Sequence, residues 1–336
     1  MANDARSAPP AVAVAASAGG VEALCAFSAS LPADFSAAVL VVLHIPPTGP
    51  SVLPKILTRA GKLPARHPTD GEPLVPGVIL VAPPDRHMAV SGSRVRLVAA
   101  ARENGHRPAA DVLMRSVAEN LGPRCAGVVL SGTMDDGAAG LSAVAGVGGL
   151  TLVQDPEEAA FPGMPNAAIE EAAPQFIGPV ATLADRICDW LASPPDASLE
   201  AVMTSASPIE LSNSGQPTPL TCPECGGTLW DHDHYGTRRY RCRVGHEFSA
   251  DNLLLGKQAA IESALWAAIV ALDERADLAR RVVTRMESSG RTSQVARYRH
   301  DIAAAEQRAE VLRGLVRDLV QGVSIHHDEG NSVDSA

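Results

Sequence analysis

AVAVAASAGGVEAL, residues 11–24, is the stretch that indicates the fold of this chain. Its first six residues are small and apolar, which is typical of a buried parallel strand. Ser17 and the glycines after it let the backbone turn sharply into a helix. The serine hydroxyl is therefore expected at the carboxyl edge of a sheet, beside the positive end of a helix. Ligands and catalytic groups of α/β proteins gather at this edge, so Ser17 is the first candidate functional residue.

Three interpretations of this turn have to be compared. Ser17 can simply cap the following helix. A dinucleotide site requires G-x-G-x-x-G and an acidic residue about 20 positions later, and residues 37–44 contain no acid. A nucleophile turn of the form G-x-S-x-G is nearly matched, with Ala15 and Gly19 at the glycine positions. The dinucleotide site is disfavoured, and the stretch alone does not choose between the other two.

The overall composition is that of a folded protein whose function depends on a particular site rather than on its net charge. The chain has 336 residues, enough for two domains or for one core with appendages. Apolar residues make up 46% of it, aromatic residues only 3%, and the mean hydropathy is +0.05. The formal net charge of −10 argues against general binding to nucleic acid or to anionic membranes.

The sequence predicts a cytoplasmic protein without membrane insertion. No apolar run approaches the roughly 20 residues that span a bilayer. Residues 16–18 resemble a signal cleavage site, but the apolar segment before them is too short and Asp4 precedes it. Cys25, Cys125 and Cys188 are scattered in apolar surroundings and are expected to pack as small core residues.

Short apolar runs alternate with helical patterns along residues 11–192. This alternation predicts an α/β fold, a doubly wound and mostly parallel sheet with helices on both faces. Strands are expected at residues 11–16, 38–43, 77–82, 95–100, 125–130 and 150–154. Helices are expected at residues 21–31, 51–61, 111–120 and 183–191, and a further helix of small residues follows the turn at 131–137 and ends near residue 147.

The remaining segments differ from this domain in composition. We expect an N-terminal tail (1–10), a linker rich in Pro, Ser, Thr and Ala (193–220), a cysteine–histidine module (221–250), a helical hairpin (251–322) and a disordered tail (323–336). The hairpin divides at residues 288–290, and each of its helices has an apolar face. The predicted faces are Ile261, Leu265, Ala268, Leu272, Ala279, Val283 and Met286 on the first helix, and Tyr298, Ile302, Ala305, Ala309, Leu312, Val316 and Leu319 on the second.

Two further polar residues follow predicted strands and extend the chemistry of Ser17. His44 comes directly after the 38–43 strand, and Asp136 lies in the glycine-flanked turn after the 125–130 strand. A serine hydroxyl is a weak nucleophile unless an imidazole takes its proton, and that imidazole needs a carboxylate to orient it. Pattern alone leaves the assignment open, because other bases and acids compete: His87 and His106, and Asp85, Asp111, Asp135 and Asp155.

Six motifs, in order across residues 12–191, resemble the catalytic domain of bacterial chemotaxis protein-glutamate methylesterases. They are ASAGGVEAL (16–24), HIPP (44–47), APPDRHM (82–88), HRP with DVL (106–108 and 111–113), LSG with DGAAG (130–132 and 136–140) and FPGMP (161–165). The resemblance implies a doubly wound α/β domain that hydrolyses glutamate methyl esters on chemoreceptors, and in some members deamidates receptor glutamines. It also implies that Ser17 is the nucleophile, His44 the general base and Asp136 the orienting acid.

The chain departs from that family at three points. Ala18 stands where the family has threonine, and Gly132-Thr133-Met134 replaces Gly-Met-Gly. An oxyanion hole of backbone N–H groups tolerates both changes, and we expect the N–H of Thr133, with that of Ala18, to form it. Only about ten residues precede the first strand, so we expect no control by an attached receiver domain.

Cys222, Cys225, Cys242 and His246 have the spacing of a zinc site made of two knuckles. A redox role requires only the C-x-x-C pair and leaves Cys242 unexplained. His232 and His234 lie between the knuckles, and either could replace His246. We expect a structural zinc in a ribbon-like module, and no cofactor for catalysis.

The partner predicted from the resemblance is a methylated chemoreceptor. The alternative is an inactive signalling scaffold that binds partners through the cysteine–histidine module and the hairpin, where a partner helix is expected. Arg239, Arg241 and Arg243 alternate along one strand face of the module. We expect this face to be solvated rather than to bind nucleic acid.

Overall fold

The computed structural model describes residues 8–48, 51–193, 215–234, 236–289 and 294–328. The chain divides into two compact units, residues 1–253 and residues 254–336. The first unit contains the predicted α/β domain together with the cysteine–histidine module, and the second contains most of the helical hairpin.

The α/β domain is built on a parallel sheet, as predicted, and this sheet has seven strands. Its strand order is β3-β4-β2-β1-β7-β8-β9, and all of its pairs are parallel. The strands are β1 Ala11–Ala16, β2 Ala38–Leu43, β3 Ala65–Arg66, β4 Ile79–Val81, β7 Cys125–Val129, β8 Leu150–Gln154 and β9 Phe176–Gly178. Every residue of β1, β2, β4 and β7 is buried, which explains their uniformly apolar sequences.

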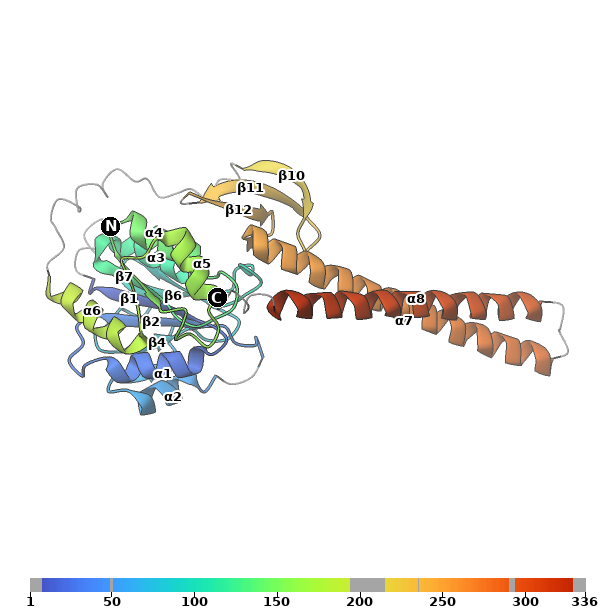
Figure 1. The fold of residues 1–336 in the computed structure, drawn as a ribbon, viewed down its shortest axis with the longest axis horizontal. Helices are drawn as coiled ribbons and strands as arrows, with labels where there is room; N and C mark the ends of the chain where they lie inside the picture. The colour runs from blue at the N-terminus through green and yellow to red at the C-terminus, as the bar shows by residue number, and fades with distance from the viewer. Residues whose placement is uncertain (1–7, 49–50, 194–214, 235, 290–293, 329–336) are drawn as a thin grey trace, which may run out of the picture. The chain divides into compact units, whose positions relative to one another are not determined.

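Helices cover both faces of this sheet (Figure 1). On one face lie α1 (Gly20–Ser30), α2 (Leu53–Ala60) and α6 (Val180–Ala192), whose apolar side chains pack with Val12, Val14 and their neighbours. On the other lie α3 (Ala110–Leu121), α4 (Ala138–Gly146) and α5 (Gly163–Ala172), which pack against Ala13, Ala15 and the residues around them. Because the central strands are parallel, their carboxyl ends lie at one edge of the sheet.

Several elements were not expected from the sequence. The apolar run at 95–100 lies outside the main sheet: β6 (Arg94–Val98) pairs antiparallel with β5 (His87–Ser91) in a separate two-stranded sheet. The short edge strands β3 and β9 and the helix α5 were missed as well. Each is too short, or too weakly periodic, for its own sequence to specify it without the neighbours it packs on.

The cysteine–histidine module is a four-stranded sheet of β10 (Gln216–Thr221), β11 (Thr228–His234), β12 (Thr237–Cys242) and β13 (Glu247–Phe248). The expected linker is therefore too long, because its end forms β10; residues 194–214 lie outside the described residues. The prediction of a solvated arginine face is also wrong for Arg239, whose exposed fraction is 0%. An ion pair with Asp111 of the α/β domain holds that side chain in the interior.

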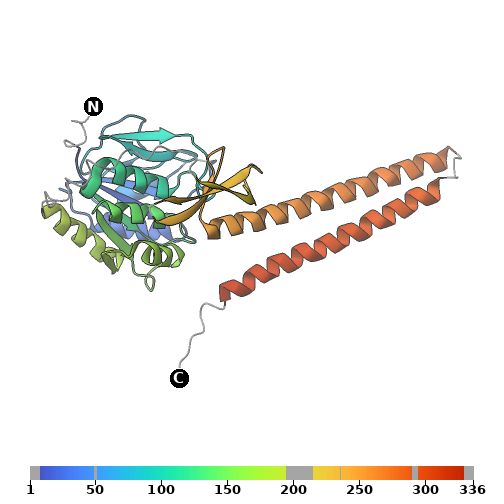
Figure 2. The same ribbon diagram turned by 90° about the horizontal axis from the view of Figure 1, so that it is seen from above.

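The hairpin consists of two long antiparallel helices, α7 (Ala250–Ser288) and α8 (Val295–Asp328), drawn in orange and red in Figure 2. Ion pairs such as Arg313–Asp273 join them. The predicted apolar face of α7 is partly wrong, since Ile269 and Ala276 are buried in place of Ile261 and Ala268, which are exposed. The disorder expected from residue 323 is wrong as far as Asp328, because α8 continues to that residue.

By length and composition alone, α7 also passes as a membrane-crossing helix, contrary to the expectation that no segment does. Only 11% of its most apolar window is buried in the structure. One such helix is weak evidence for a membrane span, because a core helix of a water-soluble protein satisfies the same test.

Candidate active site

The register of the central sheet brings Ser17 and His44 to adjacent positions. β1 and β2 pair in parallel, with Ala16 opposite Leu43 at their carboxyl ends, so the next residue on each strand is Ser17 on one and His44 on the other. The His44 N–H donates to the carbonyl of Ala16 at 3.2 Å, which continues the pairing one step past the strand. On the other side of β1, the Ser17 N–H donates to the Ser131 carbonyl at 3.0 Å.

The turn after Ser17 depends on glycine. Gly19 has φ = +67°, in the left-handed region that side chains disfavour. A Cβ at this position would also lie 2.8 Å from the Cβ of Ala160 and 2.8 Å from the Oγ of Ser131. The two glycines thus allow α1 to begin directly behind the serine, with its N-terminus facing the edge of the sheet.

His44 and Asp136 form a buried hydrogen-bonded pair. His44 Nε2 and Asp136 Oδ2 are 2.6 Å apart, and the two side chains are 7% and 2% exposed. Burial alone would raise the pKa of Asp136, but the hydrogen bonds from His44 and from the Ala110 N–H help to outweigh it and hold this pKa well below its usual range. Asp136 is therefore an ionised acceptor, and His44 Nε2 carries the proton between them.

The backbone of α3 fixes the Asp136 carboxylate. The Ala110 N–H donates to Oδ2 at 2.7 Å, and the Asp111 N–H donates to Oδ1 at 3.1 Å. These donors belong to the first turn of the helix, where N–H groups lack helical acceptors. The sequence pattern left Asp111 as a competing acid. In the structure it contacts Asp136 rather than His44, through its backbone N–H.

His44 Nδ1 is the free nitrogen of this imidazole. It is buried and has no hydrogen-bond partner among the described residues. With the proton on Nε2, Nδ1 carries the lone pair that a general base requires. No hydrogen bond between Ser17 Oγ and His44 is found within the described chain, so the contact that links nucleophile to base is not formed in this conformation.

His106 stacks on His44, with ring centroids 3.7 Å apart and an interplanar angle of 4°. Burial, assisted by the nearby His44, lowers the pKa of His106 to about 4. His106 is thus neutral at neutral pH, and its ring shields one face of His44 without adding a positive charge. The sequence pattern offered this histidine only as a competing base, and nothing in it signals the stack.

The other competing residues serve different contacts. His87 accepts the Ala109 N–H at Nδ1 and meets the Ala101 carbonyl at Nε2, so both of its ring nitrogens are engaged. Asp85 pairs with Arg107, and Asp155 accepts a backbone N–H in its own turn. His87, Asp85 and Asp155 are therefore engaged by other groups, whereas His44 and Asp136 pair with each other.

The loop after β7 lines the other side of the serine. The Gly132 N–H donates to the Phe161 carbonyl at 2.9 Å, and the Ser17 N–H is likewise engaged by Ser131. These two amides are therefore occupied, in contrast to those predicted for the oxyanion hole, Thr133 and Ala18, for which the described residues provide no acceptor. Met134 follows with φ = +71°, an unusual value for a side-chain-bearing residue.

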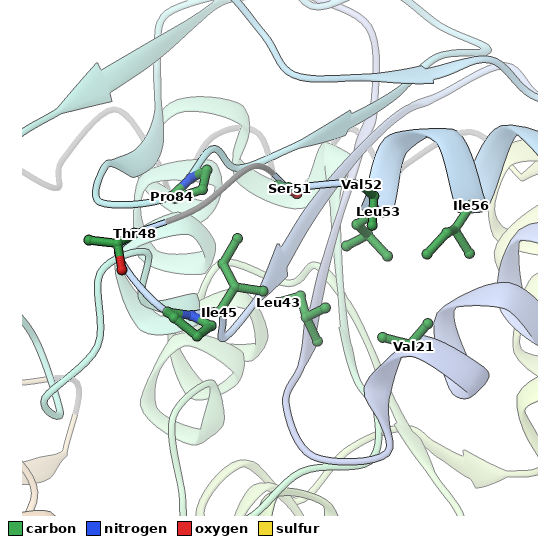
Figure 3. Close-up of a pocket in the computed structure, with 10 residues that line it drawn as sticks. Val21, Leu43, Ile45, Thr48, Ser51, Val52, Leu53, Ile56 and Pro84 are labelled. Atoms are coloured by element: carbon green, nitrogen blue, oxygen red, sulfur yellow. The ribbon is translucent and has the colours of Figure 1, made fainter.

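An apolar pocket of about 320 Å³ lies at the carboxyl end of β2 (Figure 3). Leu43 and Ile45, the neighbours of His44 in the chain, both line it, and Val21 of α1 faces them. The other side is formed by Pro84 and by the start of α2, including Val52. The pocket is suited to apolar side chains.

Cys222, Cys225, Cys242 and His246 come together in the module, with their ligand atoms all within 4.8 Å of one another. His246 Nδ1 lies 3.6 Å from Cys222 Sγ and 3.5 Å from Cys242 Sγ. A tetrahedral zinc with bonds near 2.3 Å separates its ligands by about 3.7 Å, so this donor set fits the ion. Of the alternatives raised by the sequence, it is His246 rather than His232 that joins the thiols.

Comparison with known proteins decides the family. The family model described as CheB methylesterase matches residues 12–187, more than half of the chain. This chain belongs to the CheB methylesterase family. The matched segment contains Ser17, His44 and Asp136, and ends before the cysteine–histidine module.

Individual CheB relatives agree. The chain is 42% identical over 162 residues to protein-glutamate methylesterase/protein-glutamine glutaminase 4 of Myxococcus xanthus, and 42% identical over 182 residues to its counterpart 3 of Anaeromyxobacter dehalogenans. These alignments cover 48% and 54% of this chain, and 46% and 53% of the relatives. The chain thus spans about half the length of the curated relatives it matches.

A solved CheB structure has the same fold. The crystal structure of the Thermotoga maritima CheB methylesterase catalytic domain superposes with a TM-score of 0.52 at 29% identity, covering 54% of this chain and 98% of that domain. The predicted doubly wound α/β domain is therefore confirmed.

Proposed function

We propose that this protein is a protein-glutamate methylesterase that hydrolyses glutamate methyl esters on a chemoreceptor-like protein in the cytoplasm. The observation that supports the proposal is the buried His44–Asp136 pair, in which His44 follows β2 as Ser17 follows the neighbouring strand β1. The names of its CheB relatives support the same activity, and also raise deamidation of glutamine as a second reaction.

Each residue has a definite role in the proposed reaction. Ser17 Oγ attacks the ester carbonyl while His44 Nδ1 takes its proton, and Asp136 stabilises the imidazolium that results. The N–H groups of Thr133 and Ala18 stabilise the oxyanion. His44 then returns the proton to the departing methoxide, methanol leaves, and water hydrolyses the acyl-enzyme by the same route.

The apolar pocket provides a place for the substrate chain. Side chains of the receptor segment next to the methyl ester bind between Ile45 and Val52, which holds the ester over Ser17. No cofactor takes part in the chemistry. Zinc at Cys222, Cys225, Cys242 and His246 is structural, because all four ligands come from the protein and no position is left for a substrate.

The alternative, an inactive scaffold, relies on the module and hairpin as binding surfaces. The hairpin does present exposed apolar side chains, among them Leu278 (64%) and Val311 (60%), where a partner helix can pack. Retention of the paired His44 and Asp136 beside Ser17 favours the enzyme.

Methanol release from a methylated chemoreceptor tests the proposal. We expect release by the wild type and a loss of at least about 10³-fold in Ser17→Ala. Ser30→Ala is the matched control, because Ser30 lies at the end of α1 and its hydroxyl donates to the Phe27 carbonyl within the same helix. Equal rates for wild type and Ser17→Ala would refute the catalytic role of the serine, and no release by the wild type would favour the scaffold.

A further inference from the structure

A buried arginine connects the cysteine–histidine module to the α/β domain. Arg239 on β12 is 0% exposed, and its Nη2 lies 3.1 Å from Asp111 Oδ2 and 3.8 Å from Glu171 Oε1. Its Nη1 is 3.4 Å from Asn104 Oδ1. A fully buried guanidinium is costly unless it is paired, and here the carboxylates that pair with it belong to the neighbouring domain.

Asp111, the partner of Arg239, also contacts Asp136. Its own N–H donates to Asp136 Oδ1 at 3.1 Å. Its Oδ1 accepts the N–H of Gly137 at 2.9 Å and of Gly140 at 2.7 Å, so it also holds the turn that carries Asp136. Asp111 therefore supports Asp136 from the side chain and from the backbone.

Asn104 forms a second connection. Its N–H donates to the Glu247 carbonyl at 2.8 Å, and its Oδ1 accepts the Ser249 N–H at 3.1 Å. Its Nδ2 donates to Asp111 Oδ2 at 3.2 Å and, more weakly, to Asp136 Oδ1 at 3.5 Å. The module thus holds Asn104 through the backbone of β13 and of the residue after it.

We propose that Arg239 is a positioning residue for the His44–Asp136 pair, and that metal binding in the module controls esterase activity by keeping Arg239 in place. This inference rests on the proposed function and extends it to regulation. Apart from the ligand side chains, the module has a small core, in which Leu229, Phe248 and Leu253 are buried. A core of this size does not fold stably without a metal or an equivalent cross-link.

β12 connects the metal site to the buried contact directly. It carries Arg239 in its middle and ends at Cys242, one of the four predicted ligands. Loss of the metal frees Cys242 and loosens β12, which withdraws the guanidinium from Asp111. Charged and titratable groups from several elements face this network, namely Glu103, His106, Arg115, Asp135, Asp136, Glu171, Arg239 and Glu247.

The charge balance around Asp111 supports this coupling. Burial raises the pKa of Asp111, and the Arg239 guanidinium is the largest influence that lowers it. Removal of the guanidinium therefore favours the protonated form of Asp111. A protonated carboxyl would donate a hydrogen bond in place of accepting one, which disturbs the turn that holds Asp136.

Arg239→Met is the test, and Arg238→Met is the matched control, because Arg238 is the neighbouring residue with a 71% exposed side chain. One readout is methanol release. The other is the low-field proton resonance of the short His44–Asp136 hydrogen bond, recorded on full-length protein without substrate. We expect Arg239→Met to lower kcat at least about tenfold with KM nearly unchanged, and to broaden or shift the resonance, while Arg238→Met changes neither.

Removal of the metal provides the second arm. Treatment of the wild type with 1,10-phenanthroline should reproduce the effect of Arg239→Met on both readouts, and added Zn²⁺ should reverse it. In Arg239→Met the same treatment should add less than a twofold change. Arg239→Lys, which keeps the charge, should restore most of the resonance and provides a folded variant if Arg239→Met is unstable.

Two results would overturn the inference. One is an unchanged resonance and kcat in Arg239→Met; the other is a chelator effect as large in Arg239→Met as in the wild type. The resonance separates this inference from the proposed function, because it reports on His44 even if the protein releases no methanol.

Discussion

Substitution of His106 by phenylalanine should remove a pH-dependent loss of stability from the α/β domain. The ring of His106 stacks on His44 at 3.7 Å, and burial lowers its pKa to about 4 from an ordinary value of 6.5. Below pH 6.5 the unfolded chain binds a proton that the folded chain refuses until the pH approaches 4. The free energy of unfolding therefore falls as the pH drops through this window.

The size of the effect follows from these two values. The gap between 6.5 and about 4, at about 1.36 kcal/mol for each pH unit, sets an upper limit of roughly 3 kcal/mol. Between pH 7 and pH 5 the His106 contribution amounts to about 2 kcal/mol. Phenylalanine keeps the stacked ring but binds no proton, so His106→Phe should lose about 2 kcal/mol less than the wild type over this interval.

Native-state hydrogen exchange on the amides of β1 and β2 measures this quantity for the α/β domain alone, without interference from the hairpin. His300→Gln, which removes an exposed histidine of α8, is the control and should behave as the wild type. Equal losses in the wild type and His106→Phe would refute the argument that the folded state excludes the proton from His106.

Three other changes test the site through activity. Asp136→Asn should lower kcat by roughly 10²–10⁴-fold with little change in KM. The reason is that four hydrogen-bond donors surround this carboxylate and leave no acceptor for an amide NH₂. A loss of kcat below about tenfold would contradict the role of Asp136. Gly132→Ala should lower kcat at least tenfold, since its Cβ would lie 2.1 Å from Met164 Sδ, whereas the control Gly146→Ala has open space and should retain full activity. Ile45→Lys should raise KM for a methylated receptor with a smaller effect on kcat, as measured by initial rates of methanol release.

The carboxyl edge of the sheet was predictable from residues 11–24 and from the runs at 38–43 and 125–130. These strands are buried on both faces, so their apolar sequences are continuous and end abruptly at polar or glycine residues. Parallel strands end at the same edge, which is why the pattern predicts Ser17, His44 and Asp136 along one edge. The choice of these three over the competing acids and bases came from the resemblance to the methylesterase family. The metal-ligand set was equally predictable, because its spacing is local.

The tertiary structure decided what surrounds these residues. The stack of His106 on His44, the pairing of β5 with β6 outside the main sheet and the buried location of Arg239 have no local signal. Arg239 alternates with Arg241 and Arg243 as an exposed face does, yet its partner Asp111 lies 128 residues away in the chain. A buried charge depends on the group that pairs with it. Local sequence determines where strands, turns and ligand spacings occur, whereas burial and charge pairing depend on contacts between distant segments, which only the folded chain brings together.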